Sequence, residues 1–467
     1  MARIRYHGPL AQVLIISFVC FLCPGMFNAL NAMGGAGQVD RTVSNNTNTG
    51  LYCTFIVFGV LGGSIVNLLG IRLTVSLSCL TYALNTSSYI YYNHTKRGAF
   101  TMATGPILGI GAGILWSAQG MAMMSYPEEH KKGRYISLFW VIFNLGGVIG
   151  GIVPFVINYK IGKGSDAEPL PDASYVAFVA LQVLGALCAL TLSPASRVIR
   201  SDGSHVLPTR TPHNVRHEAL ETLRQLANPW MLLLLPLSLA SNFFYSYQYG
   251  PYNGALFTLR TRGLNSMLYW AAQMAAASLV SLLHDYAGMS RRMRGLLSLA
   301  TLCLLTNAMW ACTLAVQLRY TRGPDPAAGL SQSDYPGGLI DFAEPRRAAG
   351  PMLLFCFMGA ADAHLQAFAY WLIGTMTNDA QMLARYAGFY KGMQSLGAAV
   401  AWQLDAHSVA LVAQLAVNWA LFNVAIPFTA FVAWRIKSHA DQSTHDDDEA
   451  TDDWLIDPRD TKQYERM

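Results

Sequence analysis

Residues 408–435 read SVALVAQLAVNWALFNVAIPFTAFVAWR, and the arginine at the end is the only charged residue in this stretch. The hydrocarbon core of a bilayer is about 30 Å thick, and a helix of about 20 apolar residues crosses it. The stretch exceeds that length and is rich in Val, Leu, Phe and Ala. It therefore predicts a transmembrane helix.

Eleven further stretches of similar length and character occur along the chain. Together with the first they predict an all-α integral membrane protein with twelve transmembrane helices. The eleven stretches are 10–30, 51–69, 73–92, 101–124, 135–157, 174–193, 229–249, 265–284, 295–315, 351–376 and 384–404.

The composition agrees with a membrane protein that crosses the bilayer many times. Of the 467 residues, 53% are hydrophobic and 13% are charged, whereas soluble domains carry about 25% charged residues. A soluble multidomain enzyme is therefore excluded. The net charge of +5 is small and does not indicate nucleic acid as a partner.

The distribution of Lys and Arg predicts the orientation. Cytosolic loops are enriched in these residues, and the loops on the N-terminal side hold more of them than the loops on the other side. Glycosylation sequons at Asn45 and Asn93 fall in loops on that other side. We therefore expect both termini in the cytosol and glycans on both asparagines, in either the plasma membrane or an internal membrane.

The twelve stretches form two groups of six. The longest predicted cytosolic connection, 194–228, contains three prolines and five arginines and separates the two groups. We expect an N-terminal six-helix bundle over 1–193 and a C-terminal bundle over 229–437. The acidic segment 438–467 is predicted to be a disordered cytosolic tail.

Two loops at equivalent positions in the halves share a pattern. Residues 63–72 read GSIVNLLGIR, and residues 281–292 read SLLHDYAGMSRR. Each loop has a polar residue, a glycine three positions later and then an arginine. These residues are Asn67, Gly70 and Arg72 in the first loop, and Asp285, Gly288 and Arg291 in the second.

This pattern resembles the signature loop of the major facilitator superfamily, in which an aspartate and an arginine brace helix ends at the cytosolic gate. The resemblance implies two six-helix halves with a substrate site between them. Asn67 replaces the aspartate in the first loop, which weakens the charged contact there, while Asp285 retains it.

A narrower resemblance covers much of the chain. Residues 27–37 read FNALNAMGGAG, residues 360–374 read AADAHLQAFAYWLIG, and residues 384–394 read ARYAGFYKGMQ. These segments resemble fungal members of the "uncoordinated" (Unc) ion-channel regulatory family, a divergent branch of the major facilitator superfamily. Animal members of that family affect potassium channels or escort receptors, and the resemblance implies no substrate.

Two ionisable residues lie near the middle of predicted helices: Asp362 in the tenth and Lys391 in the eleventh. A charge at bilayer depth costs about 2.5–3.5 kcal/mol on insertion scales, so it usually faces a cavity or a partner. Consecutive antiparallel helices would place both residues at similar depth, where they could form an ion pair. Such a pair either fixes helix packing or exchanges its partner for a proton, cation or ligand.

Other polar side chains share helical faces with these two or could face the same cavity. We predict a substrate or ion pathway from eight residues. They are Asn28, Asn31, Asp362, Gln366, Tyr370, Tyr390, Lys391 and Gln394. Hydrogen bonding between membrane helices is the alternative role for such residues.

The seventh stretch ends in an aromatic segment, and residues 242–253 read NFFYSYQYGPYN. Dense aromatic side chains near a helix end are typical of the belt at the membrane–water interface. The alternative is an aromatic wall at the mouth of a cavity.

The sequence contains none of the G-x-S-x-G, P-loop or HExxH motifs, so we predict no enzyme activity. Cys20 and Cys23 form a CxxC without the second pair that a zinc site needs. No cofactor and no metal are therefore expected.

Two functions remain. The first is a transporter that moves a small solute or ion through a cavity between the halves by alternating access. The second is a membrane regulator that binds a channel or escorts another membrane protein and moves nothing. The lipid bilayer surrounds the protein in both, and a membrane-protein partner belongs to the second.

Overall fold

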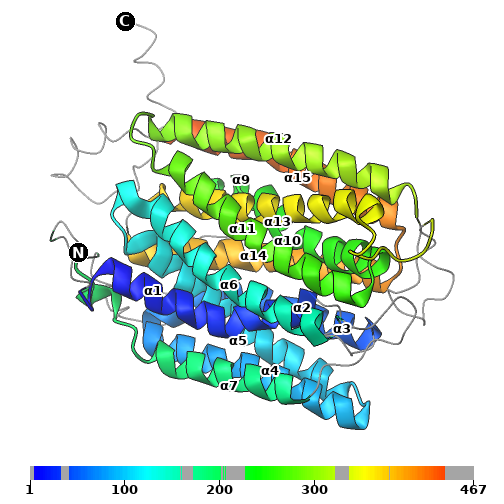
Figure 1. Ribbon diagram of the computed structural model, residues 1–467. Helices are drawn as coiled ribbons and strands as arrows, with labels where there is room; N and C mark the ends of the chain where they lie inside the picture. Colours follow the sequence, from blue (N-terminus) through cyan, green and yellow to red (C-terminus); the bar gives the residue numbers. More distant parts are fainter. Residues whose placement is uncertain are drawn as a thin grey trace, which may run out of the picture.

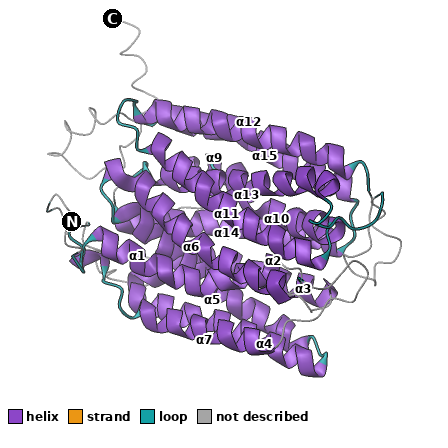
Figure 2. Cartoon of the chain, viewed as in Figure 1, coloured by secondary structure: helices purple, strands orange, loops and turns teal. Residues whose placement is uncertain are grey.

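The computed structural model describes residues 5–32, 41–157, 159, 172–200, 203, 206, 224, 227–320, 336–377 and 379–436. Within these ranges the chain is almost entirely helical (Figure 2). The helices lie side by side in one bundle (Figure 1). The predicted tail 438–467 and most of the predicted linker 194–228 lie outside the described residues.

The described residues form twelve helical rods, as the apolar stretches predict. Ten rods are single helices: α3 (Arg41–Leu69), α4 (Ile71–Thr95), α5 (Ala99–Ser125), α6 (Lys132–Ile157), α7 (Asp172–Ala189), α11 (Leu259–His284), α12 (Arg291–Gln317), α13 (Pro345–Gly374), α14 (Ala380–Ala406) and α15 (Leu411–Trp434). The composite rods are α1 (Pro9–Cys20), η1 (Phe21–Gly25) and α2 (Met26–Ala32), and α9 (Pro229–Leu233), α10 (Leu235–Tyr247) and η5 (Gln248–Gly254).

Proline marks the irregular part of both composite rods. Pro24 lies in the π-helical turn η1, and Pro251 lies in the π-helical turn η5. Proline has no backbone N–H and its ring clashes with the preceding turn of an α-helix. The wider turn accommodates the ring, so each rod continues past its proline instead of ending there.

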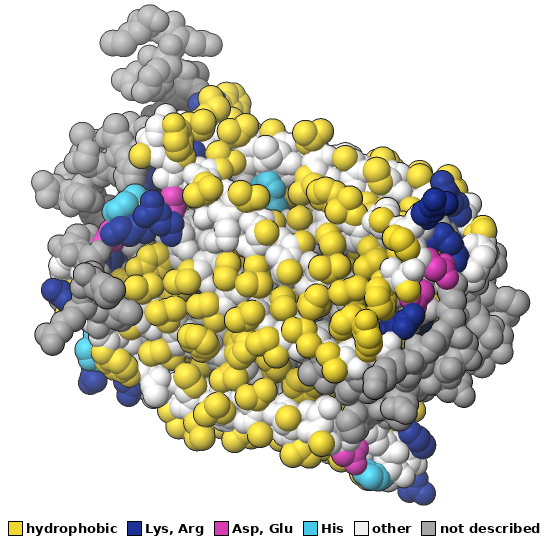
Figure 3. All heavy atoms as spheres, in the orientation of Figure 1, with side chains coloured by type: hydrophobic (Ala, Val, Ile, Leu, Met, Phe, Trp, Pro, Cys, Tyr) yellow, Lys and Arg dark blue, Asp and Glu magenta, His cyan; other side chains and the backbone are white. Residues whose placement is uncertain are grey.

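Nine of the described segments are long and apolar enough to cross a membrane. The three rods outside this group are α4, α14 and the rod containing α10. Hydrophobic side chains cover the middle of the visible face, and charged side chains gather at its two ends (Figure 3). Leu304, for example, is 74% exposed. This surface fits a protein that is solvated by lipid around its middle.

The largest error in a predicted boundary is at the start of α3. Helix α3 begins at Arg41, ten residues before the predicted start at 51. The additional turns are polar, but they contact other helices. Asn45 donates to Asp405 of α14, and Asn48 exchanges hydrogen bonds with Asn31 of α2. Polar side chains that find partners inside the bundle do not end a helix.

Helix α1 begins and α15 ends at the same end of the bundle (Figure 1), which we call the terminal end. The other is the opposite end. The half formed by α1–α7 and the half formed by α9–α15 meet most extensively in two places, and α5 also packs against α14. Helix α3 packs against α14, and α6 packs against α11.

Glycines make both of these contacts close. A Cβ added to Gly59 of α3 would lie 2.9 Å from the backbone nitrogen of Gly392 in α14. A Cβ added to Gly147 of α6 would lie 2.5 Å from the ring of Trp270 in α11. Small residues at such positions let membrane helices approach closely, and here they hold the two halves together.

Candidate functional site

A cavity lies between the halves and is lined by both. The volume of this cavity is about 60 Å³, which is enough for a few water molecules. The first half contributes mainly aromatic rings, among them Tyr52, Phe55, Tyr82, Trp116, Trp140 and Phe143, together with the amide of Asn28. The second half contributes Asn242, Tyr245, Gln366, Lys391 and Gln394.

Lys391 of α14 is the charged residue that lines this cavity, and its side chain is 4% exposed. Its Nζ donates to Oε1 of Gln394 at 2.7 Å. The same Nζ lies 4.5 Å from the ring centroid of Trp116 and 5.3 Å from those of Tyr370 and Tyr390. Aromatic faces attract a desolvated cation, so the rings compensate part of the cost of burying the ammonium.

Asp362 of α13 is 1% exposed and receives hydrogen bonds from four side chains. Its Oδ2 accepts from Tyr245 Oη at 2.8 Å, Tyr269 Oη at 3.0 Å and Gln273 Nε2 at 2.8 Å. Its Oδ1 accepts from Gln366 Nε2 at 3.4 Å. Donors of this kind replace the water that a buried carboxylate loses.

The predicted ion pair between Asp362 and Lys391 is wrong, because no N–O distance of 4 Å or less joins these two described residues. The carboxylate is turned toward α10 and α11, where its donors lie. The ammonium is turned toward Trp116 of α5 in the other half. Equal depth in the bilayer does not bring two side chains together when their helices present them to different neighbours.

Hydrogen bonds nevertheless connect the two charged residues. Gln394 Nε2 donates to Gln366 Oε1 at 3.1 Å, and Tyr390 Oη donates to the same oxygen at 3.0 Å. Gln366 in turn donates to Asp362, and Lys391 donates to Gln394. Five of the eight predicted pathway residues therefore belong to one network, which we call the α13–α14 network.

The other three predicted residues lie in different places. Asn28 lines the cavity. Tyr370 donates from Oη to Gln119 Oε1 of α5 at 3.3 Å, and its ring lies near the Lys391 ammonium. Asn31 is outside the cavity lining and pairs with Asn48 at the opposite end.

The sequence prediction missed the donors on α10 and α11. Tyr245 belongs to the aromatic segment whose favoured interpretation was an interfacial belt, yet Tyr247, Tyr249 and Tyr252 of that segment are buried. The belt interpretation is therefore wrong, and the segment packs inside the second half. Gln273 could have been predicted as a site residue, because it is a polar residue in an apolar helix.

The loop residue Asp285 connects the halves at the terminal end. Its Oδ1 accepts from the backbone N–H of Gly133 at 2.9 Å, and its Oδ2 accepts from that of Arg134 at 2.7 Å. Both donors lie at the start of α6, where helix N–H groups have no partner within the helix. Burial raises the pKa of the Asp285 carboxyl above its ordinary value, while these hydrogen bonds and Arg134 act to lower it.

The other predicted gate residues lie nearby. Gly70 precedes α4 with a φ of 80°, a conformation that favours glycine. Arg72 donates to the carbonyl of Leu192, within the first half. Asn67 is half-buried at the end of α3, and Arg291 is buried at the start of α12, three residues after Gly288. A second contact between the halves, from Lys132 Nζ to the Gly374 carbonyl, was not predicted.

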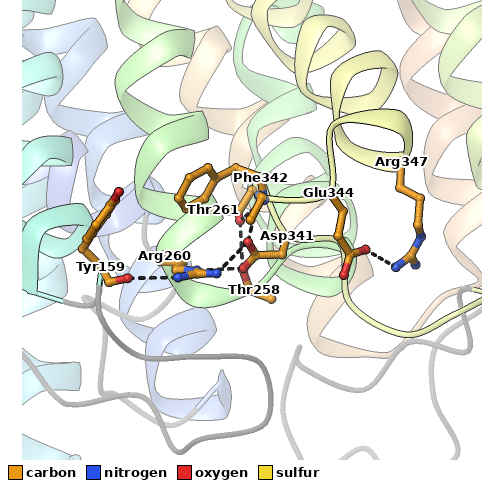
Figure 4. Close-up of polar contacts among 9 residues, drawn as sticks. Tyr159, Thr258, Arg260, Thr261, Asp341, Phe342, Glu344 and Arg347 are labelled. Atoms are coloured by element: carbon orange, nitrogen blue, oxygen red, sulfur yellow. Dashed lines mark hydrogen bonds and ion pairs between the residues drawn. The ribbon is translucent and has the colours of Figure 1, made fainter.

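The halves also meet at the opposite end. Gln403 Nε2 of α14 donates to Thr49 Oγ1 of α3 at 2.7 Å. Arg260 of α11 donates to the Tyr159 carbonyl at 2.9 Å and pairs with Asp341 at 2.8 Å (Figure 4). Burial acts to raise the pKa of Asp341, but hydrogen bonds, first that from Arg260, lower it below its ordinary value. The cavity thus lies between contacts at both ends.

The two predicted glycosylation sites differ. Asn45 is 4% exposed, and its Nδ2 donates to Asp405 Oδ2 at 3.3 Å. The structure therefore argues against a glycan on Asn45, since the glycan would displace this contact. Asn93, at the end of α4, is half-buried and donates to Asp172. Glycosylation at Asn93 stays a prediction.

Twelve rods in two halves, with a polar cavity between the halves, define a membrane protein of the major facilitator architecture. Solved structures agree. The fucose transporter FucP in its outward conformation superposes with a TM-score of 0.59 over 92% of this chain and 99% of that chain, at 12% identity. The Escherichia coli xylose transporter XylE gives 0.57 over 92% and 99%, also at 12% identity. These similarities show the fold.

The chain belongs to the UNC-93 family. The model of that family, "Ion channel regulatory protein UNC-93", matches residues 44–426. UNC93-like protein 1 of Arabidopsis thaliana is 46% identical over 95% of this chain and 94% of its own length. An UNC93-like protein of Schizosaccharomyces pombe is 38% identical over 92% of this chain and 83% of its own.

Proposed function

We propose that the protein is a transporter that moves a small solute or ion through the central cavity by alternating access. In this proposal the terminal end faces the cytosol. The two halves rock against each other, so that the cavity opens first at one end and then at the other.

The observation that carries this proposal is Lys391. A charged residue at bilayer depth costs about 2.5–3.5 kcal/mol on insertion scales. A protein that only held its helices together would save that cost with an apolar residue. Here the ammonium lines a cavity and reaches Asp362 through hydrogen bonds. Such an arrangement is useful when something enters the cavity and exchanges partners with these groups.

The contacts between the halves are suited to this movement. At the terminal end, Asp285 and Lys132 make a small number of polar contacts to the other half. At the opposite end, Gln403 of the second half donates a hydrogen bond to Thr49 of the first half. Polar contacts of this kind exchange with water when an end opens, so breaking one set at a time costs little compared with separating a large apolar interface.

A non-transporting regulator is the second candidate. The description of the matching family model favours it, since that model is named for the regulation of ion channels. Asn67 also favours a regulator, because it lacks the negative charge that the equivalent residue of the other half, Asp285, carries. The charged contact expected at the gate of a transporter is therefore weaker in the first half. In this case the cavity is a structural feature, and a channel or another membrane protein is the partner.

Comparison of metabolites and ions in cells tests the two candidates. Cells that lack the gene would receive the wild-type chain, Lys391→Gln or the control Lys96→Gln. Lys96 lies over the Tyr92 ring outside the cavity. We expect wild type and Lys96→Gln to restore the same solute level, and Lys391→Gln to leave it unrestored although it reaches the membrane. Equal restoration by the wild-type chain and both variants would contradict transport through this cavity.

A further inference from the structure

The ligand class follows from the hydrogen-bonding groups that the cavity leaves unused. Lys391 has three N–H donors, and one of them donates to Gln394. Aromatic rings face the ammonium from two further directions, but no carboxylate lies within 4 Å of it among the described residues. The ammonium is thus a buried cation without an anion beside it.

Two further donors of the cavity are free. Trp140 Nε1 is buried and has no hydrogen-bond partner in the part of the chain that the structure describes. Its ring centroid is 6.4 Å from that of Trp116, the ring under the Lys391 ammonium. Asn28 also makes no hydrogen bond to the described residues, and its amide lines the cavity. Free donors therefore come from both halves.

The acceptors of the second half are occupied. Gln394 Oε1 accepts from Lys391, and Gln366 Oε1 accepts from Tyr390 and Gln394. Asp362 accepts hydrogen bonds from four side chains and is outside the lining of this cavity. The cavity therefore has unused donors and a positive charge, without an unused negative group.

We propose that the central cavity binds a small organic anion with one negative charge, whose carboxylate accepts hydrogen bonds from the Lys391 ammonium and the Trp140 indole N–H. This inference rests on the proposed function and names its ligand class. Phe55, Tyr52 and Phe143 surround the apolar body of the anion. A single cationic side chain matches a single negative charge.

Other ligand classes fit these groups less well. A cation would meet the Lys391 ammonium without a free carboxylate to balance it. A neutral polyol would use the Asn28 amide as donor and acceptor but would leave the Lys391 ammonium without a counter-charge. An anion alone completes the buried lysine, since it supplies the counter-charge that a desolvated ammonium lacks.

The test compares ligands of one shape and different charge. The purified full-length protein in lipid nanodiscs is heated with benzoate, benzamide or benzylamine, and with acetate or acetamide as a smaller pair. We expect at least one carboxylate to raise Tm saturably, by about 2 °C or more. Benzamide, acetamide and benzylamine should leave Tm unchanged.

Two variants locate the binding. Lys391→Gln should abolish the carboxylate-dependent shift, and Lys96→Gln should keep it. Because Lys391→Gln removes a buried group, Trp140→Phe is the milder second variant, which removes only the indole N–H. It should weaken carboxylate binding about tenfold, as expected for a lost hydrogen bond to a charged group.

Three results of the binding experiment would overturn the anion inference. They are a shift with benzylamine or benzamide, a carboxylate shift that survives in Lys391→Gln, and no shift with either carboxylate. The proposed function fails separately. If Lys391→Gln restores the solute level in cells, transport through the cavity is wrong whatever binds in the nanodisc experiment.

Discussion

The two halves of the protein contribute different chemistry to one cavity. The second half carries Lys391 and the network that leads to Asp362. The first half carries aromatic rings, with Trp116 placed under the ammonium of the other half. Both halves have six rods, so the halves repeat in architecture and differ in polar groups. This difference supports the proposal that the second half binds the charge of a ligand while the aromatic rings of the first half shape the space around it.

The loops between the second and third rods of each half differ in the same sense. Asp285 in the second half accepts two backbone N–H groups from the start of α6. The equivalent residue of the first half is Asn67, which has no negative charge to offer to a helix N-terminus. The second half therefore supplies the carboxylate at the terminal end, while the first half supplies Lys132, which donates to the Gly374 carbonyl.

The largest expected effect concerns stability. Asp362→Ala leaves Tyr245 and Gln273 as buried donors without an acceptor and leaves Tyr269 with Gln248 alone, which should cost about 3 kcal/mol or more. Asn28→Ala, across the cavity, removes an amide that has no hydrogen-bond partner among the described residues and should change stability by less than about 0.5 kcal/mol. Thermal unfolding of the purified variants measures both. Equal losses of stability in the two variants would show that polar side chains of the two halves contribute equally to folding.

The next effect concerns ligand handling. Lys391→Gln removes the charge of the second half and should reduce the wild-type solute effect in cells by at least about tenfold. Trp116→Phe keeps an aromatic face under the ammonium, where a phenylalanine ring attracts a cation less than tryptophan does. It should reduce the effect a few-fold at most. A larger loss in Trp116→Phe than in Lys391→Gln would reverse the roles assigned to the halves.

The smallest expected effect concerns the loops. Asp285→Asn keeps the shape of the side chain but removes its charge from the start of α6, which should weaken the terminal end by about 1 kcal/mol. Asn67→Ala should have less effect than Asp285→Asn. Hydrogen exchange of the amides at Gly133 and Arg134 reports this end directly. Unchanged protection in Asp285→Asn would exclude it as a contact between the halves.

The sequence predicts the rods well because crossing a bilayer is a local requirement on length and hydropathy. It misplaces the start of α3 because the partners of Asn45 and Asn48 lie on other helices. It identifies Lys391 and Asp362 because charges are conspicuous in apolar stretches. It cannot predict that they face different neighbours, since that depends on how α13 and α14 are rotated in the bundle.

The same limit explains the missed residues. Tyr245 of α10 and Gln273 of α11 donate hydrogen bonds to Asp362. These contacts depend on how the two helices pack around α13, which the sequence does not show. Trp116 comes from the other half, more than 270 positions before Lys391 in the chain. Contacts between segments so distant cannot be inferred from spacing in one sequence.

Access to the cavity from the two sides of the membrane tests the central claim most directly. Asn28→Cys would be exposed to a membrane-impermeant maleimide in right-side-out and in inverted vesicles, with the wild-type chain as the control for its own cysteines. A cavity that opens alternately predicts labelling of Asn28→Cys from both sides. Labelling from neither side, with reaction only after unfolding, would contradict alternating access.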